Sequence, residues 1–350
     1  MHLWDNFPAT GGQRRFAVPG SRPRAGHVEF PRITSMTTPP RSITLRFLAA
    51  PTEVATLGGA VQGGRILEWI DKAAYACAVG WSGSYCVTAY VGNIKFTRSI
   101  ESGHLVEVEA RLVHTGRSSM HIQCTVSSAD PRTGQFTEAS NCLIIFVAVD
   151  DSGKPTSVPP WQPVTATDRA ESEEAVMRIG LRADIEEAMS KQNYTDAGTA
   201  PESLTRFLAA PTDVNWGGKT HGGTVMRWID EAAYLCGTSW NGTPCVSVYA
   251  GGVRFYRPIQ IGHVVEVDAR LLHTGAQTMH ISVHVRSGDP RTREMNLTTH
   301  CLTVVAAVDE DGAATAVQQW VPQSDEDRKL EAHARELIAL RDRARIGALA

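Results

Sequence analysis

The sequence predicts an α+β protein built from two copies of one domain, each an antiparallel sheet wrapped around a long central helix. Three observations support this prediction. The chain repeats itself at a fixed interval, each copy holds one long apolar pattern at helical spacing, and four β-rich runs follow each pattern. A chain of 350 residues has room for two domains that each bury their own core.

The internal repeat is the most specific of these signals. The segment 46–77, RFLAAPTEVATLGGAVQGGRILEWIDKAAYAC, returns at 206–236 as RFLAAPTDVNWGGKTHGGTVMRWIDEAAYLC. After a one-residue gap the offset between the copies stays constant, which predicts domains at 41–161 and 201–320. Equivalent residues include Asp71 and Asp230, Phe96 and Phe255, and Trp161 and Trp320.

Each copy is expected to begin with a loop and to continue as a helix and then strands. The run GGRILEWIDKAAYACAVGW at 63–81 spaces its apolar residues as a mostly buried helix does, with a Gly-Gly pair at its start. VEVEARL alternates apolar and charged residues, which is typical of a half-solvated antiparallel strand. The β-rich runs of the first copy are 85–96, 104–116, 119–130 and 140–150.

Three segments flank the two domains. Residues 1–40 are rich in Arg, Gly and Pro and lack the apolar region of a secretory signal, so we expect a disordered leader. Residues 162–200 are expected to form a helical linker, and residues 321–350 a C-terminal helix. Both helices carry charged patterns typical of a solvated helix packed at a domain edge.

The composition excludes several classes of protein. A net charge of −3 argues against a nucleic-acid binder, and the chain has no apolar run of the length that a membrane span needs. Seven Cys without a CxxC pair predict reduced thiols and a cytoplasmic location. His and Cys lack metal-ligand spacing, and phosphate-loop, GxGxxG and GxSxG motifs are missing, so we expect no metal and no cofactor.

The pattern NxxGxxxGGxxxxxxDxAA, followed by four long strands, resembles the hotdog-fold acyl-CoA thioesterases. With its duplication, the chain is similar to the double-hotdog cytosolic long-chain acyl-CoA hydrolases. The resemblance covers both repeats and implies a tandem double hotdog that hydrolyses fatty acyl-CoA to free fatty acid and CoA. It further implies a homo-oligomer of three double-hotdog chains, and reaction sites that take a loop from one unit and an acid from the other.

Asp71 and Asp230 are the candidate acids, because each is a carboxylate within an otherwise apolar helix. A buried carboxylate is costly unless it has a partner or a function. The resemblance implies that Asp acts as a general base or as a nucleophile. The alternative is a structural Asp that is hydrogen-bonded to nearby backbone.

The Gly-Gly pairs are candidates for stabilising a developing oxyanion. Unpaired backbone N–H groups gather at a helix N-terminus, so Gly222, and Gly63 in the other copy, can donate to a thioester carbonyl. The alternative is that glycine only permits close packing at these positions.

The two copies differ at one informative place. The second copy has Asn215 and His221 before its Gly-Gly pair, where the first has Thr56 and Gln62. An amide can donate and accept together, so it can orient a water and a carbonyl. If loops meet the acids of the other unit, Asn215 joins Asp71, and we expect that site to be competent and its counterpart to be weakened or silent. His221 alone is equally consistent with a structural histidine.

Candidate CoA-binding residues are cationic, hydroxyl or amide groups near strand ends, because phosphates favour Arg forks and free N–H groups. Taken singly, each residue is better explained as a plain surface residue than as a ligand. They are Arg98, Arg117, Ser118 and Ser119 in the first copy, and Arg257, Gln277 and Thr278 in the second.

Two other functions remain open on the sequence. One is a hotdog hydratase or dehydratase acting on enoyl-CoA, although neither copy shows the Asp-x4-His pattern of that class. The other is a non-catalytic acyl-CoA-binding or sensing module. Release of thiol from palmitoyl-CoA, measured beside equilibrium binding, separates hydrolysis from binding alone.

Overall fold

The computed structural model describes residues 39–53, 59–192, 194–195, 197–213, 218–292 and 294–347. The leader expected at residues 1–40 lies outside the described residues up to residue 38. Thr56 and Asn215 also lie outside them.

Each repeat contributes one long helix and six strands to the described part of the chain. The first repeat holds β1 (Ser42–Leu48), α1 (Gly63–Ser82), β2 (Cys86–Val91), β3 (Ile94–Phe96), β4 (Leu105–Thr115), β5 (Ser119–Ala129) and β6 (Thr137–Ala148). The second holds β7 (Glu202–Leu208), α3 (Gly222–Asn241), β8 (Cys245–Ala250), β9 (Val253–Arg254), β10 (Val264–Thr274), β11 (Thr278–Gly288) and β12 (Asn296–Ala307). Single 3-10 turns, Pro51–Glu53 and Pro211–Asp213, follow β1 and β7.

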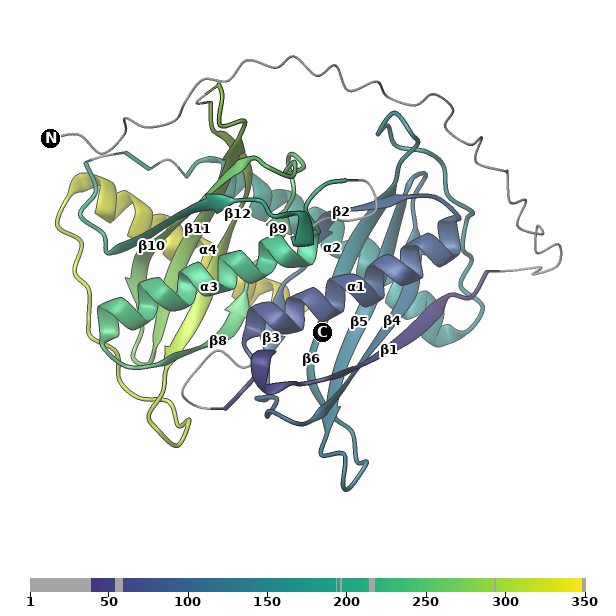
Figure 1. Cartoon of the computed structure of the whole chain (residues 1–350), viewed down its shortest axis with the longest axis horizontal. Coiled ribbons are helices and arrows are strands. Elements are labelled where there is room, and N and C mark those ends of the chain that lie inside the picture. Colours follow the sequence, from purple (N-terminus) through teal and green to yellow (C-terminus); the bar gives the residue numbers. More distant parts are fainter. Residues whose placement is uncertain are drawn as a thin grey trace, which may run out of the picture. The chain divides into compact units, whose positions relative to one another are not determined.

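The strands of both repeats join into one antiparallel sheet (Figure 1). Its main path runs β1-β4-β5-β6-β3-β8-β12-β11-β10-β7, so β1 and β7 form its two ends. The repeats meet where β3 pairs with β8, and where β2 pairs with β9. The predicted α+β fold, with two tandem antiparallel units, is therefore confirmed.

Two details of the predicted strands were wrong. A strand precedes each helix, because the segment expected to be a loop pairs residue for residue with β4 in the first repeat, Ser42 with Arg111 through Leu48 with Leu105. The run at 85–96 is also two strands rather than one. Its break lies at Gly92, where the N–H donates to the Leu143 carbonyl and an added Cβ would meet that oxygen at 2.8 Å.

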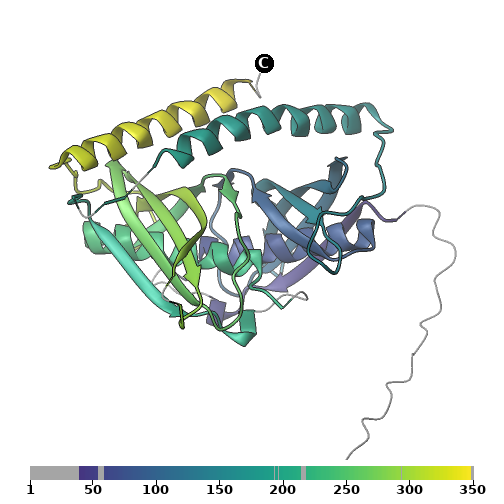
Figure 2. The ribbon, with the colours of Figure 1, turned by 90° about the horizontal axis from the view of Figure 1, so that it is seen from above.

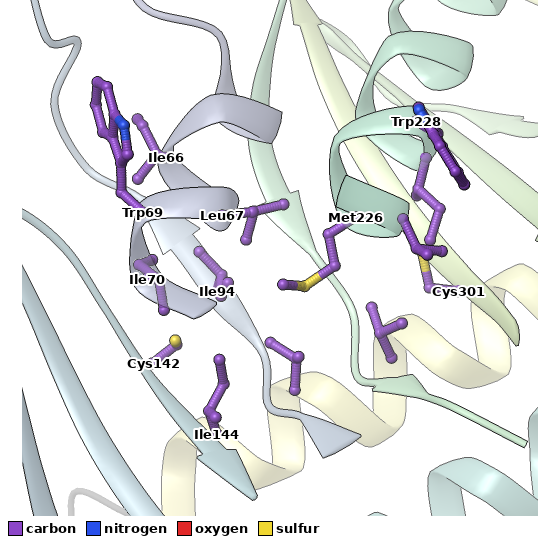
Figure 3. Close-up of a cluster of buried hydrophobic side chains, with 14 of the residues drawn as sticks. Ile66, Leu67, Trp69, Ile70, Ile94, Cys142, Ile144, Met226, Trp228 and Cys301 are labelled. Carbon is purple, nitrogen blue, oxygen red and sulfur yellow. The ribbon is translucent and has the colours of Figure 1, made fainter. Parts of the chain in front are cut away.

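The helix α1 buries the apolar face that its spacing predicts. Ile70 and Ala73 have no exposed surface, and α1 packs on β4, β5 and β6. Helix α3 packs in the same way on β10, β11 and β12, and the two helices pack on each other (Figures 1 and 3). Gly83 and Gly242 end the helices in the left-handed conformation, at φ of 64° and 73°.

The two charged segments form α2 (Ala166–Ser190) and α4 (Asp325–Gly347), which lie together over one side of the sheet (Figure 2). Helix α2 packs on β4, α4 packs on β10, and the two helices contact each other. Thr165 and Asp168 form a capping box at the start of α2, and Ser324 bonds the Asp327 N–H at the start of α4.

Candidate active site

The N-terminal turns of α1 and α3 lie side by side and run in opposite directions. A Cβ added to Gly64 would meet the Cα of Arg227 at 2.8 Å, and one added to Gly223 would meet the Cα of Glu68 at 2.9 Å. Each glycine thus permits a helix–helix approach that any side chain would prevent. This close approach brings the start of each helix to the acid of the other repeat.

The Asp71 carboxylate is fully buried and satisfied by donors from both repeats. The Gly223 N–H of α3 donates to Oδ2 and the Thr88 hydroxyl of β2 donates to Oδ1, each at 2.8 Å. The Nδ1 of His221 pairs with Oδ2 as well. Three donors therefore hold one carboxylate in place at the N-terminus of α3.

His221 is the N-cap residue of α3, and its side chain is 21% exposed. Burial alone would lower the pKa of His221, but the charge and hydrogen bond of the Asp71 carboxylate outweigh burial and raise it. The ring of Tyr75 lies edge-on to the imidazole, with 5.8 Å between the ring centroids. The pair of Asp71 and His221 thus joins a buried acid to a base that solvent can reach.

Asp230 occupies the equivalent place against the start of α1. The Gly64 N–H donates to Oδ2 at 2.8 Å, and the Ser247 hydroxyl donates to Oδ1. Burial raises the pKa of Asp230, against the lowering effect of these two hydrogen bonds. Gln62 is the N-cap of α1, where α3 has His221, so this site holds the acid and the glycines without an imidazole.

A cavity of about 160 Å³ opens at the Asp230 carboxylate. It is lined by residues of both repeats, among them Gly63, Phe96, Arg98, Tyr234 and Ser247. Such a space beside a helix N-terminus suits a small carbonyl group and part of its chain.

The first glycine of each pair is the backbone donor left for a ligand. Gly223 and Gly64 donate their N–H groups to the two carboxylates. Within the described part of the chain, the N–H groups of Gly222 and Gly63 donate to no acceptor. A carbonyl oxygen placed there would be stabilised by that N–H and by the positive end of the helix dipole.

The candidate CoA-binding residues lie in four places. Arg98 lines the cavity at Asp230. Arg257, in the equivalent position of the second repeat, donates to the Asn296 side chain at 2.8 Å. The rest lie at the β4–β5 and β10–β11 turns: Arg117, Ser118, Ser119, Gln277 and Thr278.

Sequence reasoning missed the two hydroxyls that hold the acids. Thr88 and Ser247 are equivalent residues, each seventeen positions after the Asp that it contacts. A hydroxyl kept at the same place in both copies was the signal that could have identified them.

The described residues hold no group of three or more His, Cys, Asp or Glu side chains arranged to bind a metal ion. None of the helices among those residues has the length and apolar character needed to cross a bilayer.

The fold and the paired sites define a tandem hotdog protein. In it, the acid of each unit accepts a hydrogen bond from the start of the other unit's helix. The profile of the Thioesterase superfamily matches the chain twice, at residues 58–135 and 217–294. The chain therefore contains two tandem domains that match the thioesterase superfamily.

Two relatives and one solved structure are similar to this chain. The human cytosolic acyl coenzyme A thioester hydrolase is 24% identical over 79% of this chain and 77% of its own length. Protein VdlD of Helicobacter pylori is 29% identical over 37% of this chain and 74% of its own length. A solved structure assigned as an oleoyl thioesterase from Lactobacillus plantarum shares the fold, with a TM-score of 0.54, 11% identity, and coverage of 77% of this chain and 97% of that one.

Proposed function

We propose that this chain is an acyl-CoA hydrolase that converts fatty acyl-CoA to free fatty acid and CoA. One competent site lies between the two units and is formed by Asp71, His221 and Gly222, and the comparison of the two repeats assigns Asn215 to the same site. The observation that carries the proposal is the Asp71–His221 pair beside the unused N–H of Gly222. Two relatives whose names state acyl-CoA thioester hydrolysis, from human and mouse, align over most of the chain and support it.

The proposed reaction uses these four residues. The thioester oxygen accepts the Gly222 N–H, and the amide of Asn215 orients the water. His221 takes a proton from that water as its oxygen attacks the carbonyl carbon, and Asp71 stabilises the imidazolium that forms. The C–S bond then breaks, and His221 returns the proton to the CoA thiolate, so that water has been added across the thioester.

The burial of Asp71 favours this assignment over direct attack by its carboxylate. The side chain has no exposed surface, and its two oxygens already accept three donors. A carboxylate that attacked the carbonyl would first have to give up at least one of these bonds. His221 is the member of the pair that a water can reach.

The proposal includes the remaining properties expected from the sequence. Hydrolysis requires no metal and no dissociable cofactor, because the chain supplies the base and the oxyanion donor. Location in the cytoplasm is proposed from the cytosolic relatives.

An assembly of three double-hotdog chains is proposed because β1 and β7 end the sheet path, and open strand edges favour association. Light scattering tests it by a mass near three times 38.0 kDa.

Thiol release from acyl-CoA by four variants tests the function and the site together. Asp71→Asn is expected to lose at least about 100-fold in kcat/KM, because the base loses its charged partner. Asn215→Ala is expected to resemble it, and combining the two is expected to cost little more, since both act in one site. Asp230→Asn should keep most of the activity.

The outcomes separate the alternative functions. If Asp230→Asn is as inactive as Asp71→Asn while both fold by circular dichroism, the single competent site is wrong. Binding of palmitoyl-CoA without thiol release by the native chain would indicate a sensing module. Addition of water to an enoyl-CoA with its thioester left intact would indicate a hydratase.

A further inference from the structure

A line of four charged side chains crosses the contact between α1 and α3. Glu68 accepts from Arg65 of its own helix and from Arg227 of the other, with 3.3 Å between Oε1 and Nε of Arg227. Arg227 also donates to Glu231 at 2.7 Å. The charges therefore alternate from α1 to α3, and the central carboxylate is only 8% exposed.

The central pair of this line joins equivalent positions of the two repeats. Glu68 lies three residues before Asp71, and Arg227 lies three residues before Asp230. In an antiparallel pair of equivalent helices, a contact between equivalent positions lies on the pseudo-two-fold axis. Figure 3 shows another equivalent pair, Leu67 and Met226, with the two side chains pointing toward each other.

A residue on this axis would contact its own copy if two like repeats paired, so its charge can distinguish pairing of like repeats from pairing of unlike ones. If two first repeats paired through this face, Glu68 would meet its own copy, and if two second repeats paired, Arg227 would meet its own copy. Both cases place like charges together at a largely buried contact. Only a first repeat against a second repeat places opposite charges there, with each central residue flanked by a partner of opposite sign.

We infer that the Glu68–Arg227 contact selects the pairing of the first repeat with the second over the pairing of like repeats. The glycines and the flexible apolar residue that both repeats offer there, Leu67 or Met226, do not discriminate. The Thr224 hydroxyl also donates to Glu68, at 3.3 Å, and stands where the first repeat has Arg65. A buried ion pair often adds little net stability, whereas leaving one member with a like charge is strongly unfavourable. Such a contact is therefore suited to choosing a partner.

This choice determines which acid meets which helix start. The observed pairing places Asp71 against His221 and Asp230 against the helix that begins after Gln62. Pairing of like repeats would instead place Asp71 against Gln62 and Asp230 against His221. The inference about pairing rests on the interface alone, so its test needs no substrate and is independent of the proposed hydrolysis.

A charge-reversal cycle in the full chain, read by thermal unfolding, tests the inference. E68R and R227E each place like charges on the axis and should lower Tm by at least about 4 °C. The double variant E68R/R227E places opposite charges there again and should recover at least half of the combined loss. Recovery is partial because Arg65 and Glu231 then lie beside like charges.

Lys72→Glu is the matched control, because it reverses an exposed charge one turn further along α1 and should leave Tm within about 1 °C. If a single reversal yields no soluble protein, restored soluble yield in the double variant is the same test, and the neutral pair E68Q and R227Q supplies a second cycle. Losses that simply add in the double variant, or single reversals that leave Tm unchanged, would overturn the inference.

Discussion

At the scale of single residues, two equivalent carboxylates have different neighbours. Asp71 and Asp230 accept from equivalent glycine N–H groups and from equivalent hydroxyls, but only Asp71 contacts an imidazole. The difference follows from one position, His221 in one helix start and Gln62 in the other. One substitution between the copies is therefore enough to change the proton chemistry that each site can perform.

The pKa of His221 provides a direct test of this pairing. We expect titration by NMR to give a pKa above the ordinary value of about 6.5 in the native chain. In Asp71→Asn the pKa should fall below that value, because burial remains and the opposing charge is gone. In the proposed reaction the neutral imidazole is the active form, so kcat/KM of the Asp230→Asn chain should decline as the pH falls through the native pKa of His221. An unchanged pKa in Asp71→Asn would contradict the pairing.

At the scale of the helices, the Gly-Gly pairs fit both roles that the sequence left open, close packing and donation of an N–H to a ligand. Gly64 and Gly223 allow the helices to approach and donate to the acids, whereas Gly63 and Gly222 keep an N–H unused. Close packing is thus what brings each helix start within reach of an acid.

Gly64→Ala should destabilise the fold, since its Cβ would overlap the backbone of Arg227. The cost of such overpacking is about 1–3 kcal/mol. Gly80→Ala is the control in the same helix, because nothing lies within 4 Å of its Cβ position and alanine favours a helix by about 1 kcal/mol. Urea unfolding of both variants measures the contrast, and equal effects would show that the helix contact tolerates a side chain.

Much of the fold could be predicted from the sequence because the repeat marks equivalent positions and each helix has a clear apolar period. The strand β1 was missed because its alternation of apolar and polar residues, SITLRFL, is short. Its pairing with β4, which identifies it as a strand, cannot be seen in the sequence. Asp71, His221 and the Gly-Gly pairs could be singled out as sequence differences or repeats. Thr88, Ser247 and the Glu68–Arg227 contact depend on which segments meet across the interface, and spacing along one chain does not reveal that.

The side of the sheet beneath α2 and α4 also differs between the repeats. His284 and His300 face each other across paired strands of the second repeat, where the first has Thr125 and Asn141. Burial, with a smaller effect from His333, lowers the pKa of His300 to about 4. The Tyr256 hydroxyl lies 2.9 Å from its Nε2.

Acid should therefore weaken the second repeat. A histidine whose pKa is lowered on folding stabilises the fold fully above its unfolded pKa of about 6.5, and that stability is lost as the pH falls toward about 4. His300→Asn, which installs the residue of the first repeat, should reduce the proton uptake on unfolding by about one proton in this range. Unfolding free energies measured from pH 7 to pH 4 give that slope, and Asn141→Gln is the control in the first repeat.

At the scale of the whole chain, duplication gives two sites that share one framework and differ in their functional groups. The Asp230 site keeps the Gly63 N–H, the Gly64 and Ser247 donors, and a cavity that reaches the carboxylate. By sequence equivalence it lacks the imidazole and the Asn amide. The Asp230 site therefore has the framework and lacks two side chains, so under the proposed function a change at two positions should raise its activity.

Thr56→Asn with Gln62→His, made in the Asp71→Asn chain, supplies both groups to the Asp230 site. The Asp230 carboxylate then gains an imidazole to orient, as Asp71 has in the native chain, and a general base contributes at least about 100-fold in favourable geometry. We expect kcat/KM to rise at least about tenfold above that of Asp71→Asn, measured by CoA release. The matched control makes the opposite exchange in the native chain, Asn215→Thr with His221→Gln, and should reduce activity to the level of Asp71→Asn. If the first exchange leaves activity unchanged in a folded chain while the second abolishes it, the two sites differ by more than these two side chains.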